Sequence, residues 1–258
     1  LGLRRAGTPG HIAMGTSSSH RSPNTPGWER VKQLYQQPSP DPREVASRIT
    51  SALDPATRRG MSSPGVACCL SSLLQASRLA AQGGLAALVT VVDRPPLLAA
   101  SEAVREQAER AIARGGHASR FSDLGLNALA TAMFEAGAGG APELFSITAD
   151  QATDALASYH RDRRLHRLAL TFVGHDFDHL YRYFVTRDTS EYVGGPGLPT
   201  VAEASQLRDA VSRHCRETVA ALEAAAHEQA LAAALCLDGR EALAQAVVKK
   251  MSKNDAKA

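Results

Sequence analysis

Apolar residues recur along most of the chain at steps of three and four, which is the spacing of one face of an α-helix. Trp28, Val31, Leu34 and Tyr35 form the first stretch of this kind. The longest stripe combines Leu170, Val173, Phe177, Leu180 and Phe184. The pattern predicts helices over residues 28–35, 42–53, 63–81, 97–114, 121–136, 148–185, 200–222 and 235–248, with an interruption near 174 in the longest of them.

Several of these helices begin at residues that can cap a helix N-terminus. Asp41 precedes a proline and a glutamate in the first predicted turn. Thr148 and Gln151 have the spacing of a capping box, in which each side chain accepts a hydrogen bond from the other residue's backbone. Thr200 and Glu203 repeat that spacing. These three starts are therefore predicted from local chemistry as well as from periodicity.

The chain is expected to form an all-α fold, a compact helical body with a flexible N-terminal arm. Residues 85–92 are ambiguous, because their Val-Thr-Val-Val end fits either a helix end or one short strand. The run from Gly137 to Gly140 is the expected boundary between two halves. We therefore expect an arm over 1–26, helical halves over 27–136 and 141–250, and a basic tail over 251–258.

Composition supports helix and a soluble chain. Hydrophobic residues make up 44% but aromatic residues only 5%, and Ala and Leu dominate the apolar positions. The net charge of +3 permits contact with nucleic acid without indicating it. No apolar run approaches the roughly 18–20 residues that span a bilayer. We expect reduced thiols, and hence a cytoplasmic location without membrane contact, from the spacing of the cysteines, Cys68, Cys69, Cys215 and Cys236.

One polar cluster has the residue types of a metal site. His175 and His179 are one helical turn apart, and Asp176 and Asp178 lie between them. They define the hypothesis of a metal-dependent hydrolase. The alternative is a polar helix face opposite the apolar stripe, on which Asp178 pairs with Arg182 at the i,i+4 spacing.

The densest basic run contains Arg161, Arg163, Arg164 and Arg167. On one continuous helix, Arg163 and Arg167 share a face, which suggests contact with phosphates and a nucleic-acid-binding helical protein. The alternative is a solvated helix face that Asp162 partly neutralises.

Motifs of other enzyme classes are absent from the sequence. It contains no G-x-S-x-G elbow, P-loop or G-x-G-x-x-G fingerprint, and no histidine lies near Cys68 or Cys69. We therefore expect no bound cofactor, and a role without catalysis is favoured over an enzymatic one.

The segment Met14–Ser19 has the features of a protein start. If translation begins at Met14, removal of the methionine leaves Gly15 as a free N-terminal glycine, whose α-amine has a pKa near 8 and is a competent nucleophile for acylation. The spacing also fits N-myristoylation. The remaining interpretation is a disordered serine-rich tail.

Two segments resemble the QatB component of bacterial Qat anti-phage systems. The first is Met14–Ser19 with Thr25, Pro26 and Trp28, and the second is the region from Leu170 to His175 with the helices that follow it. The resemblance covers about a third of the chain.

The resemblance implies a non-enzymatic subunit acting beside an ATPase, a QueC-like enzyme and a TatD-like nuclease. It also implies that Gly15 is conjugated to a deazapurine by the QueC-like partner. The leading hypothesis is accordingly an accessory, protein-binding subunit of an anti-phage defence system. The metal-dependent hydrolase and the nucleic-acid-binding protein remain alternatives.

Overall fold

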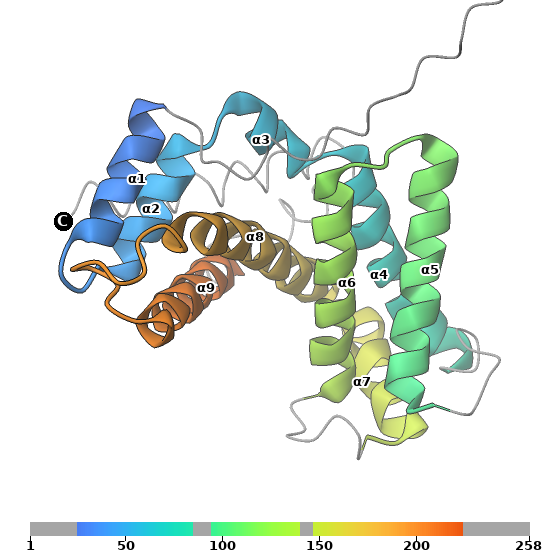
Figure 1. Cartoon of the computed structure of the whole chain (residues 1–258). Coiled ribbons are helices and arrows are strands. Elements are labelled where there is room, and N and C mark those ends of the chain that lie inside the picture. Colours follow the sequence, from blue (N-terminus) through green and yellow to red (C-terminus); the bar gives the residue numbers. More distant parts are fainter. Residues whose placement is uncertain (1–24, 85–93, 140–146, 224–258) are drawn as a thin grey trace, which may run out of the picture.

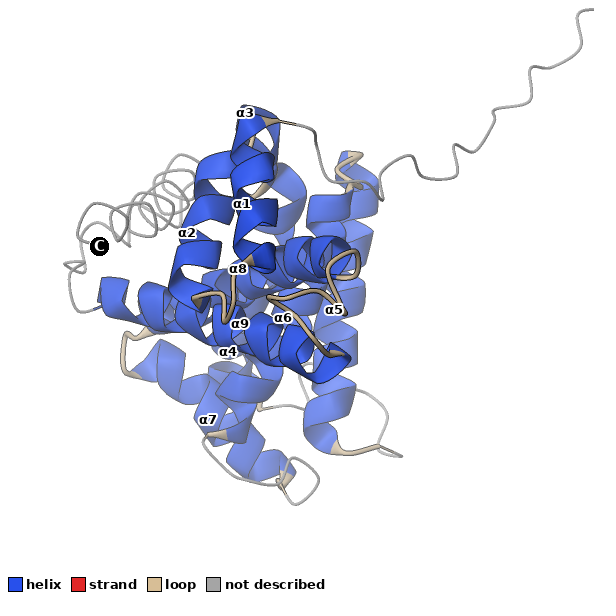
Figure 2. Cartoon of the chain, turned by 60° about the vertical axis from the view of Figure 1, so that its left-hand side comes forward, coloured by secondary structure: helices blue, strands red, loops and turns tan. Residues whose placement is uncertain are grey.

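The structure is a computed structural model that describes residues 25–84, 94–139 and 147–223. Every regular element in these ranges is a helix, which confirms the all-α fold (Figure 2). An isolated bridge between Val193 and Leu198 is the only strand-like pairing there. The helices are α1 (Pro26–Gln36), α2 (Pro42–Ala52), α3 (Pro55–Gly60), α4 (Pro64–Gly83), α5 (Pro96–Gly115), α6 (Arg120–Ala138), α7 (Ala149–Arg161), α8 (Leu165–Thr189) and α9 (Val201–Glu223).

The three predicted helix starts are confirmed. The Asp41 side chain accepts a hydrogen bond from the backbone of Arg43 at the start of α2. Thr148 and Gln151 form a complete capping box at the start of α7. The Thr200 hydroxyl accepts the Glu203 amide at 3.2 Å, and the Glu203 carboxylate accepts the Thr200 amide at 2.9 Å, before α9. Local chemistry thus fixes where these helices begin.

The predicted helix over 148–185 is wrong in one respect, because it ends and restarts at 162–164 rather than at Gly174. Arg163 adopts the left-handed conformation, with φ of 55°. The Arg164 amide donates to the Tyr159 carbonyl and the Arg163 amide to the His160 carbonyl, which is the pattern of a Schellman motif. Gly174 stays helical inside α8, where it faces Val219 of α9.

The helices pack around two cores that share α8. One, the α4–α7 core, combines buried side chains of α4, α5, α6 and α7 with Leu168, Ala169 and Phe172 of α8. The other, the α1–α9 core, combines side chains of α1, α2 and α9 with the stripe of α8 that includes Phe177 and Leu180. Figure 1 shows α8 running from one group of helices to the other.

The two cores do not follow the boundary expected at 137–140, since each contains residues from both sides of it. The ambiguous segment 85–92, the arm up to residue 24 with Gly15, the expected last helix and the basic tail lie outside the described residues. Three cysteines are described, and all three are free: Cys68, Cys69 and Cys215. No helix of the described ranges is long and apolar enough to cross a bilayer.

Candidate functional site

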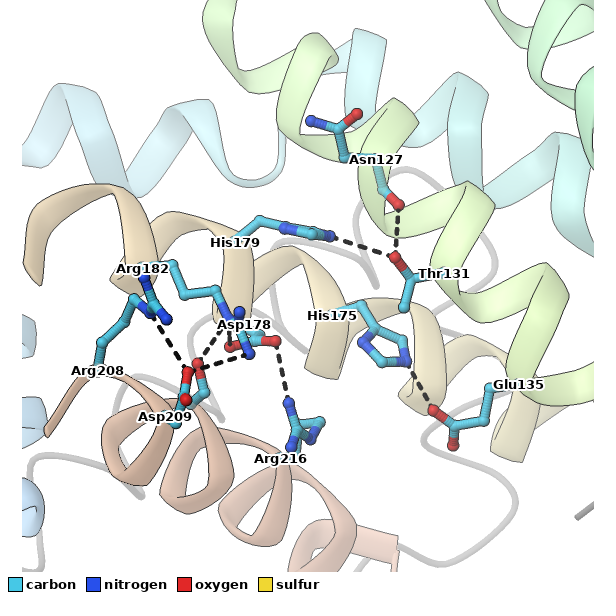
Figure 3. A network of polar contacts seen from close by, with 11 residues as sticks. Asn127, Thr131, Glu135, His175, Asp178, His179, Arg182, Arg208, Asp209 and Arg216 are labelled. Atoms are coloured by element: carbon cyan, nitrogen blue, oxygen red, sulfur yellow. Dashed lines mark hydrogen bonds and ion pairs between the residues drawn. The ribbon is translucent and has the colours of Figure 1, made fainter. Parts of the chain in front are cut away.

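The polar cluster of α8 is divided between two neighbouring helices. His175 and His179 point toward α6, whereas Asp178 and Arg182 point toward α9 (Figure 3). This polar face is not directed to solvent, because His175, Asp176 and Asp178 are each no more than 6% exposed. The predicted pair of Asp178 and Arg182 is confirmed, with 3.0 Å between Oδ1 and Nε.

The two histidines each contact a side chain of α6. His175 Nε2 lies 2.7 Å from Glu135 Oε2, and this hydrogen bond holds the pKa of the Glu135 carboxyl below its usual value. His175 Nδ1 is buried without a hydrogen-bond partner in the described structure. His179 Nε2 lies 3.4 Å from the Thr131 hydroxyl, and burial lowers the pKa of His179.

Asp178 contacts one arginine of its own helix, Arg182, and one of α9, Arg216. Its Oδ1 accepts from Arg182, and its Oδ2 lies 3.1 Å from Arg216 Nη1. Burial by itself would raise the pKa of Asp178, but hydrogen bonds from Ser212 and Arg182 and the charges of both arginines outweigh it, so the pKa is lowered. Asp178 is thus a carboxylate at neutral pH, held in an ion-pair network (Figure 3).

The geometry gives the metal-site hypothesis no support within the described ranges. They contain no group of three or more His, Cys, Asp or Glu side chains arranged to hold a metal ion. The reason is that His175 and Asp178 face different helices, and each already has a partner.

The basic run does not form one helix face, because the chain turns between α7 and α8. Arg161 lies at the end of α7 and pairs with Asp154, and Arg163 is the exposed left-handed residue of the turn. Arg164 Nη2 lies 2.7 Å from Asp162, so the expected partial neutralisation is confirmed for this arginine. Only Arg164 and Arg167 reach a common pocket.

That pocket, the α6–α9 pocket, has a volume of about 450 Å³. It brings Arg164 and Arg167 together with His175, one member of the proposed metal cluster, and with Arg216 of α9. The pocket thus combines residues of the basic run with one residue of the proposed metal cluster, which the sequence predicts as two different sites. The other lining residues are Glu135 of α6, Tyr159 of α7, Leu170, Thr171 and Gly174 of α8, and Glu217 and Val219 of α9.

No pattern in the sequence marks Arg216, Glu135 or Tyr159 as site residues. Each comes from a different helix, and no short-range spacing connects them with α8. The sequence places Arg216 on the predicted helix that begins at Thr200. That position does not reveal that Arg216 contacts Asp178 of another helix.

The positive charge of the pocket comes from the side chains of Arg164, Arg167 and Arg216. Glu135 and Glu217 are the carboxylates of the lining. The pocket can therefore offer both donors and acceptors to a ligand.

A comparison of the chain with protein-family models, curated protein sequences and solved structures gives no significant match.

Proposed function

We propose that this chain acts by binding and that the α6–α9 pocket is its ligand site. The observation that carries the proposal is the convergence of α6, the α7 end, α8 and α9 on one pocket lined by three arginines and a buried histidine. Its volume, about 450 Å³, falls in the range of pockets that hold small ligands.

Unmet hydrogen-bonding capacity in the pocket wall is the second support. Buried polar atoms without a partner are uncommon in folded proteins. Two such atoms among the described residues, Arg164 Nε and His175 Nδ1, belong to residues that line this pocket. Both nitrogens are buried, so a bound polar molecule becomes their partner only if these side chains change rotamer.

The test is a thermal-shift screen of the full chain with small anionic, zwitterionic and uncharged compounds. A ligand of the pocket is expected to raise the melting temperature of the wild type and to leave a pocket-filling variant, Thr171→Trp, unchanged. Thr171 lines the pocket. Val201→Trp is the matched control, because Val201 is 70% exposed and lies outside the pocket. Equal shifts in both variants would contradict the assignment of the site.

A second proposal concerns the N-terminal arm, whose sequence at Met14–Ser19 resembles the start of a defence-system subunit. We propose that Gly15 is a modification site and that the helical body is an accessory subunit that binds partner proteins of such a system. The support for this proposal is the sequence resemblance at Met14–Ser19, which continues through Thr25, Pro26 and Trp28. The last three of these residues are described in the structure. Thr25 caps α1, and Trp28 is 2% exposed, packed against Phe184.

Intact mass and N-terminal peptide mapping of the protein, expressed from its own genomic neighbourhood, test the second proposal. A chain that begins at Gly15 and carries an added mass of nucleobase size is the expected result. An unmodified chain beginning at Leu1 would remove the Gly15 mechanism and the partner assignment that depends on it.

A further inference from the structure

We infer that the ligand of the α6–α9 pocket is a small phosphorylated molecule that also carries hydroxyl or amine donors, such as a sugar phosphate or a nucleoside monophosphate. This inference rests on the binding function proposed above for the same pocket. The arginines of the lining are suited to bind the phosphate, and its carboxylates are suited to accept hydrogen bonds from the hydroxyl or amine groups.

Arg164 and Arg216 have N–H donors that are available to a ligand. A guanidinium carries five N–H donors in a planar fork that matches the oxygens of phosphate. Arg216 gives Nη1 to Asp178, and Arg164 gives Nη2 to Asp162 and Ser158. Their side chains remain 42% and 38% exposed. Together with Arg167 they surround the pocket from the α7–α8 turn, from α8 and from α9.

The pairing with Asp178 orients one of these donors. Asp178 is buried and is also held by Arg182, so it fixes the direction of the Arg216 side chain across the α8–α9 interface (Figure 3). A guanidinium oriented in advance loses less side-chain entropy when it binds an anion. The same logic applies to Arg164, whose guanidinium lies over the Tyr159 ring.

The carboxylates of Glu135 and Glu217 make the pocket unfavourable for a simple inorganic anion. A carboxylate repels a bare phosphate but accepts hydrogen bonds from hydroxyl and amine groups. Glu135 is hydrogen-bonded to His175, which gives it a defined position at the wall shared by α6 and α8. A ligand with a phosphate at one end and donors at the other satisfies both kinds of lining residue.

A small ligand fits this arrangement better than a nucleic-acid chain does. The remaining arginines of the basic run, Arg161 and Arg163, do not line the pocket, and Arg161 is paired with Asp154. The charges therefore converge on one pocket instead of following an extended backbone, which is how proteins contact a polynucleotide.

The inference is tested by titration calorimetry of the full chain at low salt with adenosine monophosphate, ribose 5-phosphate, inorganic phosphate and adenosine. We expect the two phosphorylated compounds to bind and adenosine to bind at least about tenfold more weakly, since it lacks the charged hydrogen bonds. Inorganic phosphate is expected to bind more weakly than ribose 5-phosphate. Binding of the phosphorylated compounds should weaken as salt increases.

Arginine variants with matched controls test whether binding of the phosphorylated compounds depends on the arginines of the pocket. Arg216→Gln and Arg167→Gln are each expected to weaken binding about tenfold, which corresponds to one charged hydrogen bond. Arg208→Gln is the control for Arg216→Gln, because Arg208 lies on the same helix and pairs with Asp209 but does not line the pocket. Arg213→Gln is the control for Arg167→Gln, because Arg213 is exposed outside the pocket. Both controls should bind within about twofold of the wild type.

The outcomes separate the ligand class from the binding function itself. If adenosine binds as tightly as its phosphate, or if the pocket arginine variants bind like the wild type, the phosphate assignment is wrong. If an unphosphorylated compound binds and Thr171→Trp abolishes it, the binding function stands without that assignment. If no compound in this or the earlier screen binds, both proposals fail. If a single-stranded oligonucleotide binds and the monophosphate does not, the arginines bind a nucleic-acid chain and the small-ligand inference is wrong.

Discussion

Two carboxyl groups of α8, Asp176 and Asp178, are both buried but have opposite surroundings. Asp178 receives hydrogen bonds from arginines of α8 and α9, and its pKa is lowered. No charge among the described residues offsets the burial of Asp176, which raises its pKa to about 7. Asp176 also contributes, after burial itself, to the raised pKa of the Cys69 thiol, about 12. The same residue type therefore has two different protonation behaviours within one helical turn.

Asp176→Asn is expected to stabilise the protein at pH 8 and to have little effect near pH 4. With its raised pKa, the folded protein keeps a proton that the unfolded chain loses between about pH 4 and 7, so wild-type stability falls as pH rises through that window. Asparagine resembles the protonated form. Urea unfolding should show a gain of about 2 to 4 kcal/mol at pH 8.

Asp154→Asn is the control for this change, since Asp154 is exposed on α7 and its substitution should change stability by less than about 0.5 kcal/mol. Equal stability of Asp176→Asn and wild type at pH 8 would show that Asp176 has no raised pKa.

Asp178→Asn is expected to destabilise the protein by about 1 to 3 kcal/mol at pH 7, because Arg182 and Arg216 lose their charged partner. The pKa of Asp178 is lowered, so its contribution is present at neutral pH and is lost only as pH falls through that lowered value. A double-mutant cycle with Arg216→Gln, measured by urea unfolding, should give a coupling of about 0.5 kcal/mol or more. Strict additivity would contradict the interaction.

At the scale of single elements, residues close in sequence decide where helices begin, and tertiary packing is not needed to find them. The caps at Asp41, Thr148 and Thr200 are made by side chains two or three residues from their partners. The end of α7 was missed because an arginine, Arg163, occupies the left-handed position that glycine usually fills. Without glycine or proline there, the sequence favoured a continuous helix.

Arg163→Gly is expected to stabilise the protein by about 0.5 to 1 kcal/mol, because glycine adopts a φ of 55° without the steric cost of a Cβ atom. Thermal or urea unfolding measures the change. Arg163→Ala is the control, since it removes the same charge and keeps the Cβ atom, and it should give no gain. A loss of stability in the glycine variant would argue against the left-handed turn between α7 and α8.

At the scale of the whole molecule, α8 connects the two cores. Its 25 residues extend about 38 Å, at 1.5 Å per residue, and its buried side chains enter both cores. Separating the cores would expose part of α8 on either side. We therefore expect the described helices to unfold together rather than as two halves divided at 137–140.

Leu129→Ala tests this cooperativity. Leu129 is fully buried in the α4–α7 core, and its truncation should cost about 2 to 5 kcal/mol. Trp28 is the single tryptophan of the sequence and lies in the α1–α9 core, so its fluorescence reports that core, whereas far-UV circular dichroism reports all helices. Both signals should shift to the same lower urea midpoint. An unchanged fluorescence midpoint would indicate two independent units, and the exposed Val201→Ala should shift neither signal.

The sequence by itself determined the helical class, three helix starts and the approximate bounds of α1, α2, α4, α5, α6 and α9, because these depend on apolar spacing and on caps formed within one turn. It did not predict α3 or the break between α7 and α8. Tertiary structure alone decided the partners of the polar side chains. His175 contacts Glu135 from 40 positions away, and Asp178 contacts Arg216 from 38 positions away. No local pattern encodes such pairs, because the packing of α6 and α9 against α8 is what brings them within hydrogen-bonding distance.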